Sequence, residues 1–115
     1  ERFRPAIASL DLARHPVPRV TVGGGIGKLT KLAQGARDLH SGRSQVDFDR
    51  LANALGVPDV KNMNTALEVY EKTREKHSQW VADNALNEVR KLVPLSVVDV
   101  MVMDRQGNII AQAGP

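Results

Sequence analysis

Hydrophobic and polar positions repeat with two different periods along the chain, and each change of period predicts a new element. Apolar residues at helical spacing predict a helix over 1–14, and the segment 19–22, in which 20–22 are β-branched, is typical of a short buried strand. After a glycine-rich segment, an apolar stripe at intervals of three and four predicts a helix over 26–39, with Gly35 inside it. The first half therefore alternates helix, strand, glycine segment and helix.

The second half begins with a short helical pattern and ends with strand patterns. Asp47 suits the N-cap of a helix that Gly56 would stop. The longest helical pattern runs from Asn64 or Thr65 to Leu92, and its polar stretch 73–79 predicts either a break or one exposed turn, which puts His77 at the surface. The segment 95–104 then predicts a strand, and the turn at 104–108 lets 108–113 pair back as a hairpin.

These elements predict an α/β fold in the order α-β-α-α-α-β-β. A strand–glycine loop–helix unit is followed by a helical middle and a C-terminal β-hairpin. Helices between the strands at 19 and 96 indicate an α/β sandwich with at least one crossover, which we expect to be right-handed. We expect residues 1–115 to form a single domain. Because the sequence opens with Glu1 and no initiator Met, we also expect it to be part of a larger α/β protein.

Composition narrows the function classes. The 115 residues include no cysteine, so thiolate nucleophiles, disulfides and thiolate metal sites are excluded for this chain. The formal charge is +3, but the basic residues form no block and aromatic residues make up only 3%. This composition disfavours binding of nucleic acid. No apolar run is long enough to span a membrane. A small polycarboxylate or phosphate ligand fits this balance, as does an ordinary solvated surface.

The glycine segment is the first candidate site. A strand that ends in glycines and leads into a helix presents backbone N–H groups and the positive end of the helix dipole. Lys28 in the first turn adds charge, so an anion site is one interpretation and a tight turn needing positive φ angles is the other. The P-loop pattern fails because Val22 stands at its first glycine, and the dinucleotide pattern fails because Lys28 or Thr30 stands at its third.

His40 is the second candidate, in a polar loop with Ser41 after the predicted helix. It could transfer a proton or bind a ligand, or it could simply be a histidine favoured at a helix C-terminus. No pair of histidines has metal-ligand spacing, so we expect no metal bound by protein side chains.

A longer pattern resembles a known family. Its specific part is "GIGKLTKLAQG" followed by "LHS" and "VD", and Asn64-Thr65-Ala66 and the closing "VVDVMVMDRQGNII" also match. This pattern resembles the C-terminal portion of CbiD, the cobalt-precorrin-5B C(1)-methyltransferases of anaerobic cobalamin biosynthesis. The resemblance covers most of residues 17–115.

The resemblance implies a cytoplasmic enzyme that uses S-adenosyl-L-methionine to methylate a ring carbon of a cobalt-corrinoid precursor. The partner would be a missing N-terminal domain of the same chain; a non-catalytic anion- or tetrapyrrole-binding domain is the alternative. Either the corrinoid carboxylates or S-adenosylmethionine could occupy the glycine loop. No catalytic residue is assigned, and His40 is the first to test. The expected binding residues are Gly23, Gly24, Gly25, Gly27, Lys28, His40 and Ser41, with Lys31, Arg37 and Arg43 as further basic residues nearby.

Overall fold

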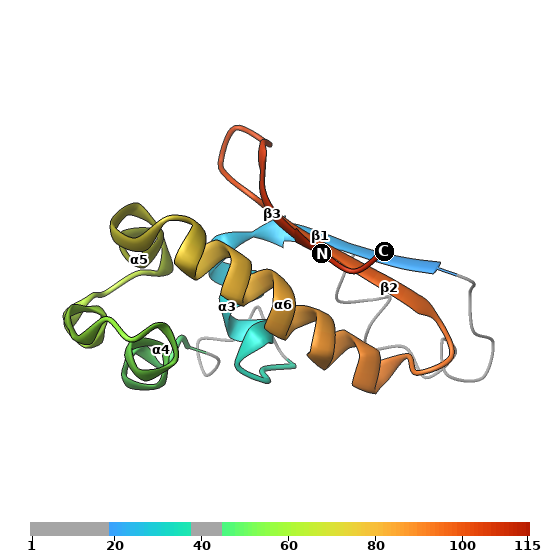
Figure 1. Ribbon diagram of the computed structural model, residues 1–115, viewed down its shortest axis with the longest axis horizontal. Coiled ribbons are helices and arrows are strands. Elements are labelled where there is room, and N and C mark those ends of the chain that lie inside the picture. Colours follow the sequence, from blue (N-terminus) through green and yellow to red (C-terminus); the bar gives the residue numbers. More distant parts are fainter. Residues whose placement is uncertain (1–18, 38–44) are drawn as a thin grey trace.

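Three strands form one mixed sheet in the computed structural model, which describes residues 19–37 and 45–115 (Figure 1). The strands β1 (Arg19–Gly25), β2 (Val97–Met103) and β3 (Ile109–Ala113) lie in the order β1-β2-β3. β1 and β2 are parallel, whereas β2 and β3 are the antiparallel arms of the predicted hairpin. The α/β class is therefore confirmed, while the predicted helix over 1–14 lies outside the described residues.

In its described residues, the segment between β1 and β2 is mainly helical, as predicted. It contains α3 (Ile26–Ala33), α4 (Phe48–Leu55), the 3₁₀ helix η1 (Pro58–Asn62), α5 (Ala66–Thr73) and α6 (Glu75–Leu92). Of these, α3 and α6 cover one face of the sheet, where their buried side chains join those of the strands in the main core. A second core forms between α4, η1 and α5 around Leu51, Leu55, Val60 and Val69.

The opposite face of the sheet carries polar and half-exposed apolar side chains. Val97 is 49% exposed and Ile109 is 48% exposed. Arg19 donates to Asp99 at 2.7 Å, and Thr21 donates to the same carboxylate at 2.7 Å. The described helices all lie on the other side of the sheet (Figure 1).

β1 is longer than its sequence predicts, because it runs through the first three glycines. Gly23, Gly24 and Gly25 are in register with Met101, Val102 and Met103 of β2. The expectation of a loop beginning at residue 23 is therefore wrong. Glycine has low strand propensity, and here pairing with a distant strand overrides that preference.

α3 is shorter than predicted because Gly35 ends it. Gly35 has φ +95°, its N–H donates to Leu32 O, and the N–H of Ala36 donates to Lys31 O. This is the Schellman arrangement, which satisfies the last carbonyl groups of a helix. The expectation that the helix continues to residue 39 is wrong, and Gly35 is its C-terminal stop.

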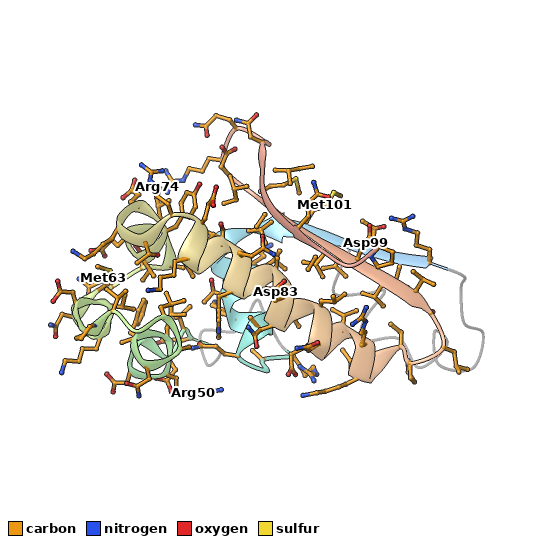
Figure 2. All side chains as sticks on the ribbon, viewed as in Figure 1. Arg50, Met63, Arg74, Asp83, Asp99 and Met101 are labelled. Carbon is orange, nitrogen blue, oxygen red and sulfur yellow. The ribbon has the colours of Figure 1, made fainter. Side chains whose placement is uncertain are left out.

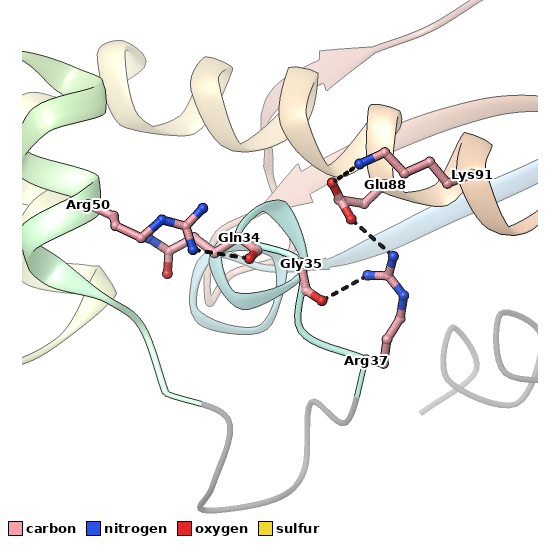
Figure 3. Close-up of polar contacts among 6 residues, drawn as sticks. All are labelled: Gln34, Gly35, Arg37, Arg50, Glu88 and Lys91. Carbon is pink, nitrogen blue, oxygen red and sulfur yellow. Dashed lines mark hydrogen bonds and ion pairs between the residues drawn. The ribbon is translucent and has the colours of Figure 1, made fainter.

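Two arginines hold this helix end in place (Figure 3). Arg37 donates to Gly35 O and forms an ion pair with Glu88 of α6 at 3.0 Å, and Lys91 bonds the other oxygen of Glu88. From α4, Arg50 donates to Gln34 O. Arg37 therefore lies at the opposite end of α3 from the glycine segment, which corrects the expectation that it surrounds that segment.

Two further predictions from local sequence are confirmed. Asp47 caps α4 by accepting from the N–H of Arg50, and Gly56 ends α4 in the left-handed conformation with φ +69°. The polar stretch 73–79 contains the predicted break, at Arg74 between α5 and α6. Arg74 has φ +51° and ψ −121°, a backbone conformation that favours glycine.

Candidate functional site

A pocket of about 670 Å³ opens where β1 and β2 end at the same edge of the sheet. Three parts of the chain form its walls: the start of α3, the helix α5 up to Arg74, and the end of β2 with the turn that follows. Ligands of sheets with parallel strands bind beyond the carboxyl ends of those strands. The lining residues include Gly25, Gly27, Thr65, Tyr70, Glu71, Arg74, Met103, Asp104, Arg105 and Ile110.

Neither Gly25 nor Gly27 at this edge is required by the fold. None of Gly23, Gly24, Gly25 and Gly27 has a positive φ, so the interpretation as a tight turn needing such angles is wrong. A Cβ atom added at Gly25 or Gly27 would meet nothing within 4 Å. Both residues line the pocket, so the missing side chains leave room beside the backbone that a ligand could occupy.

The other predicted site residues that the structure describes do not line the main pocket. Lys28 is exposed in the first turn of α3 and is not part of the pocket lining. Among the residues that the structure describes, no side chain caps this helix. Lys31 lines a smaller recess of about 240 Å³ that shares Gly27 with the main pocket. His40, Ser41 and Arg43 lie outside the described residues.

Two arginines that sequence reasoning missed line the pocket from opposite elements. Arg74 comes from the α5–α6 junction and Arg105 from the β2–β3 turn. Figure 2 shows Arg74 at that junction, on the side toward which the hairpin extends. The Arg74 guanidinium lies over the Tyr70 ring, with Cζ 5.4 Å from its centroid. The sequence offered a weak signal for Arg74, namely the polar break, but none that placed Arg105 beside it.

Two carboxylates also line the pocket, and they differ in their partners. Asp104 accepts from the N–H group of Asn108, from the Asn108 side chain and from the N–H group of Gln106, and these hydrogen bonds hold the pKa of its carboxyl group below the ordinary value. Asp104 therefore shapes the turn. Glu71 is exposed on α5, and within residues 19–37 and 45–115 it forms no ion pair with Arg74 or Arg105.

A buried hydrogen-bond network fixes the start of α3 beneath the pocket. The Thr30 hydroxyl donates to Ile26 O at 2.5 Å and lies 3.1 Å from His77 Nε2. Because that hydroxyl has a single proton, His77 must donate from Nε2, which leaves Nδ1 unprotonated. His77 is fully buried, so the expectation of a surface position is wrong; its side chain packs inward from the first turn of α6.

Burial also sets the charge of this histidine. Loss of hydration lowers the pKa of His77 to about 4, so the ring is neutral at pH 7. Its Nδ1 atom has no hydrogen-bond partner within the described part of the chain. His77 therefore supports α3 as a neutral donor and does not add charge near the pocket.

In the described residues, no three His, Asp or Glu side chains gather in a way that could hold a metal ion. None of the helices described is both long enough and apolar enough to cross a membrane.

The chain is similar to methyltransferases over nearly nine-tenths of its length, which confirms the resemblance found in the sequence. It is 44% identical over 113 aligned positions to the cobalt-precorrin-5B C(1)-methyltransferase of Paramagnetospirillum magneticum, covering 89% of the chain and 32% of that protein. The proteins of the same name from Brucella anthropi and Brucella ovis are 42% and 43% identical over 115 positions, covering 88% of the chain and 31% of each protein.

The chain thus spans about a third of the length of these relatives. No family model matches it. No solved structure matches it either.

Proposed function

We propose that this chain is the C-terminal domain of an S-adenosylmethionine-dependent methyltransferase that acts on a cobalt-corrinoid precursor, cobalt-precorrin-5B, in cobalamin biosynthesis. The observation that carries the proposal is the 44% identity to a protein of that name over 89% of the chain. The pocket at the carboxyl ends of β1 and β2 supports it, because that is where a ligand of such a sheet is expected. Residues 1–115 would form one domain of a cytoplasmic enzyme, and the rest of the protein would be its partner.

In this proposal the glycine segment binds substrate or methyl donor. Gly25 and Gly27 leave space at the pocket, Gly23 and Gly24 continue the same strand, and Lys28 supplies positive charge at the start of α3. His40 and Ser41, beyond the described residues, complete the set of candidates. Methyl transfer breaks the bond from sulfonium sulfur to methyl and forms a bond to the ring carbon, with S-adenosylhomocysteine leaving. Such a step depends on proximity and alignment, so His40 is only the first residue to test for a catalytic role.

A non-catalytic role within a longer enzyme is the second candidate. The observation that favours it is length, because the chain corresponds to about a third of its relatives. A domain of this kind could hold the tetrapyrrole or another domain while the chemistry takes place elsewhere.

The test uses the full-length protein and this chain side by side. Methyl transfer from labelled S-adenosylmethionine to a cobalt-corrinoid precursor is measured for both, together with corrinoid binding. We expect the full-length protein to transfer the methyl group. If the chain alone binds the corrinoid but transfers nothing, the binding role is supported; if the full-length protein also transfers nothing, the proposed activity is wrong.

A further inference from the structure

Two guanidinium groups line the pocket, and no carboxylate among the residues that the structure describes is paired with them. Arg74 and Arg105 line it from elements that are 31 residues apart in the sequence, and the described residues form no ion pair with either. The Arg74 guanidinium lies over Tyr70, a contact that leaves the edge donors of the planar group available. An arginine over an aromatic ring is well suited to bind a carboxylate through two parallel hydrogen bonds.

The backbone at Arg74 gives a second reason to assign it a function. A residue other than glycine rarely adopts φ +51° with ψ −121°, and among the described residues Arg74 is alone in having a positive φ without being glycine. Residues held in such conformations cluster at ligand-binding positions. Glycine would fit this junction between α5 and α6 with less strain, yet the chain has a long cationic side chain there, directed to the pocket.

We propose that Arg74 and Arg105 bind a carboxylate group of the ligand in this pocket. The inference rests on the proposed function, because both of its ligands carry carboxylates: the corrinoid precursor on its peripheral side chains and S-adenosylmethionine on its amino-acid end. The space beside Gly25 and Gly27 lets the rest of the ligand approach the backbone. Arg74 and Arg105 thus add positive charge inside the pocket to the charge that Lys28 supplies at the start of α3.

Glu71 distinguishes the two sources of the carboxylate. It is the pocket's second carboxylate besides Asp104, and it stands one helical turn before Arg74. An amino-acid end brings an ammonium group beside its carboxylate, which Glu71 would attract. A ligand bearing carboxylates alone would be repelled by the same side chain.

The experiment is calorimetric titration of the full-length protein with two probes, S-adenosylhomocysteine and cobyrinic acid, and with cobinamide as a corrinoid whose side chains are amides. The variants are Arg74→Gly, Arg74→Lys, Arg105→Ala and Glu71→Gln. Arg90→Ala, which removes an exposed arginine of α6 outside the pocket, is the matched control. Arg74→Gly is chosen because glycine accepts the backbone conformation, so a folding defect is not the expected reason for lost binding.

We expect Arg74→Gly to weaken one carboxylate probe by about ten- to a hundredfold, Arg105→Ala by a smaller factor, and Arg90→Ala by none. Arg74→Lys should restore part of the loss, and cobinamide should not respond to Arg74→Gly. Glu71→Gln should weaken S-adenosylhomocysteine or tighten cobyrinic acid, whichever ligand occupies the pocket. If both probes bind Arg74→Gly as they bind wild type, the inference is overturned. Methyl transfer by wild type, measured in parallel, separates this failure from a failure of the proposed function.

Discussion

His77 is a titratable group that the core holds in one charge state. Its pKa is about 4 in the folded chain, against 6.5 for an ordinary histidine, because burial removes the hydration of the imidazolium. Between these values the unfolded state binds the proton and the folded state does not. The free energy of unfolding therefore keeps the full contribution of the neutral His77 above pH 6.5, and it decreases as the pH falls from 6.5 to 4.

We predict that the free energy of unfolding at pH 5 is about 2 kcal/mol lower than at pH 7, mainly because of this histidine. His77→Leu should flatten this pH dependence because it removes the titrating imidazole. The variant should still fold, since the Thr30 hydroxyl keeps its bond to Ile26 O. Urea unfolding at pH 7, 6 and 5 provides the measurement. The pKa values of Glu88, Asp99 and Asp104 are lowered from 4.5 or 3.8, so these groups lose their contribution only at lower pH. An equal slope in wild type and His77→Leu would contradict the assignment.

Replacing Gly27 should affect stability and ligand binding in opposite directions. It lies in the first turn of α3 without a positive φ, and an added Cβ would meet nothing within 4 Å. We predict that Gly27→Ala stabilises the chain by a few tenths of a kcal/mol up to about 1 kcal/mol, through helix propensity. The same methyl group should weaken ligand binding by about tenfold, because it enters the pocket.

The matched control for this prediction is Gly56→Ala. Gly56 needs its φ of +69° to end α4 and lies outside the pocket, so alanine there should destabilise the chain and leave binding unchanged. Thermal melts and ligand titration of both variants give the comparison. If Gly27→Ala lowers the melting temperature and spares binding, this glycine has a structural role.

Lys28 is tested in the same way. We predict that Lys28→Ala in the full-length protein weakens ligand binding by roughly ten- to a hundredfold, the value of a charge-assisted hydrogen bond of about 1.5 to 3 kcal/mol. Folding should change by only a few tenths of a kcal/mol, since a cation in the first turn opposes the helix dipole. Lys31→Ala, one turn along, should have smaller effects on both. A Lys28→Ala variant that binds like wild type would remove this residue from the site.

At the scale of elements, the junction between α5 and α6 is the strained point. The conformation of Arg74 costs about 1 to 3 kcal/mol for a residue other than glycine. We predict that Arg74→Gly raises the free energy of unfolding by about 1 kcal/mol, the relief of strain being partly offset by the greater freedom of glycine in the unfolded chain. Arg74→Ala keeps the strain and should bring no gain. Urea unfolding of wild type and both variants measures these changes. If Arg74→Gly is less stable than wild type, the guanidinium group supports the fold.

Elements were predictable where their signals are local. The cap at Asp47 and the stop at Gly56 lie next to the residues that they organise, and the structure has both. The extent of β1 depends on β2, about 80 positions later, so the glycine residues gave no sign of their strand conformation. Gly35 carried a usable signal as a helix stop, which the apolar stripe on either side obscured.

Only the local part of the candidate site could be predicted from the sequence, because the rest depends on contacts between distant elements. Gly25 and Gly27 could be found because strand, glycines and helix are contiguous. Arg74 and Arg105 line the same pocket only through the packing of α5 against α3 and of the hairpin against α6, which no spacing in the sequence encodes. The burial of His77 is likewise a tertiary effect, since a polar stretch gives no indication of which turn faces the core.

At the scale of the whole molecule, the sheet has one face that the described helices do not cover. Val97 and Ile109 are about half exposed there. Because the relatives are about three times as long, we expect the remainder of a longer protein to cover this face. We predict that Ile109→Thr changes the stability of this chain by less than about 0.5 kcal/mol, but that of the full-length protein by more than about 1 kcal/mol. If Ile109→Thr shifts the melting temperature of the chain and of the full-length protein by equally small amounts, this face of the sheet is exposed to solvent in both.

The parallel pairing of β1 with β2 also has a consequence for synthesis on the ribosome. Arg19 and its partner Asp99 are 80 residues apart, so β1 leaves the exit tunnel long before the strand that completes it. At about 5 to 20 residues per second, its edge waits on the order of ten seconds for a partner. During that time Val20 and Val22 are available for mispairing with other nascent chains. The three glycines at the end of the strand lower its tendency to aggregate, so the same run that opens the pocket protects the protein while it is being made.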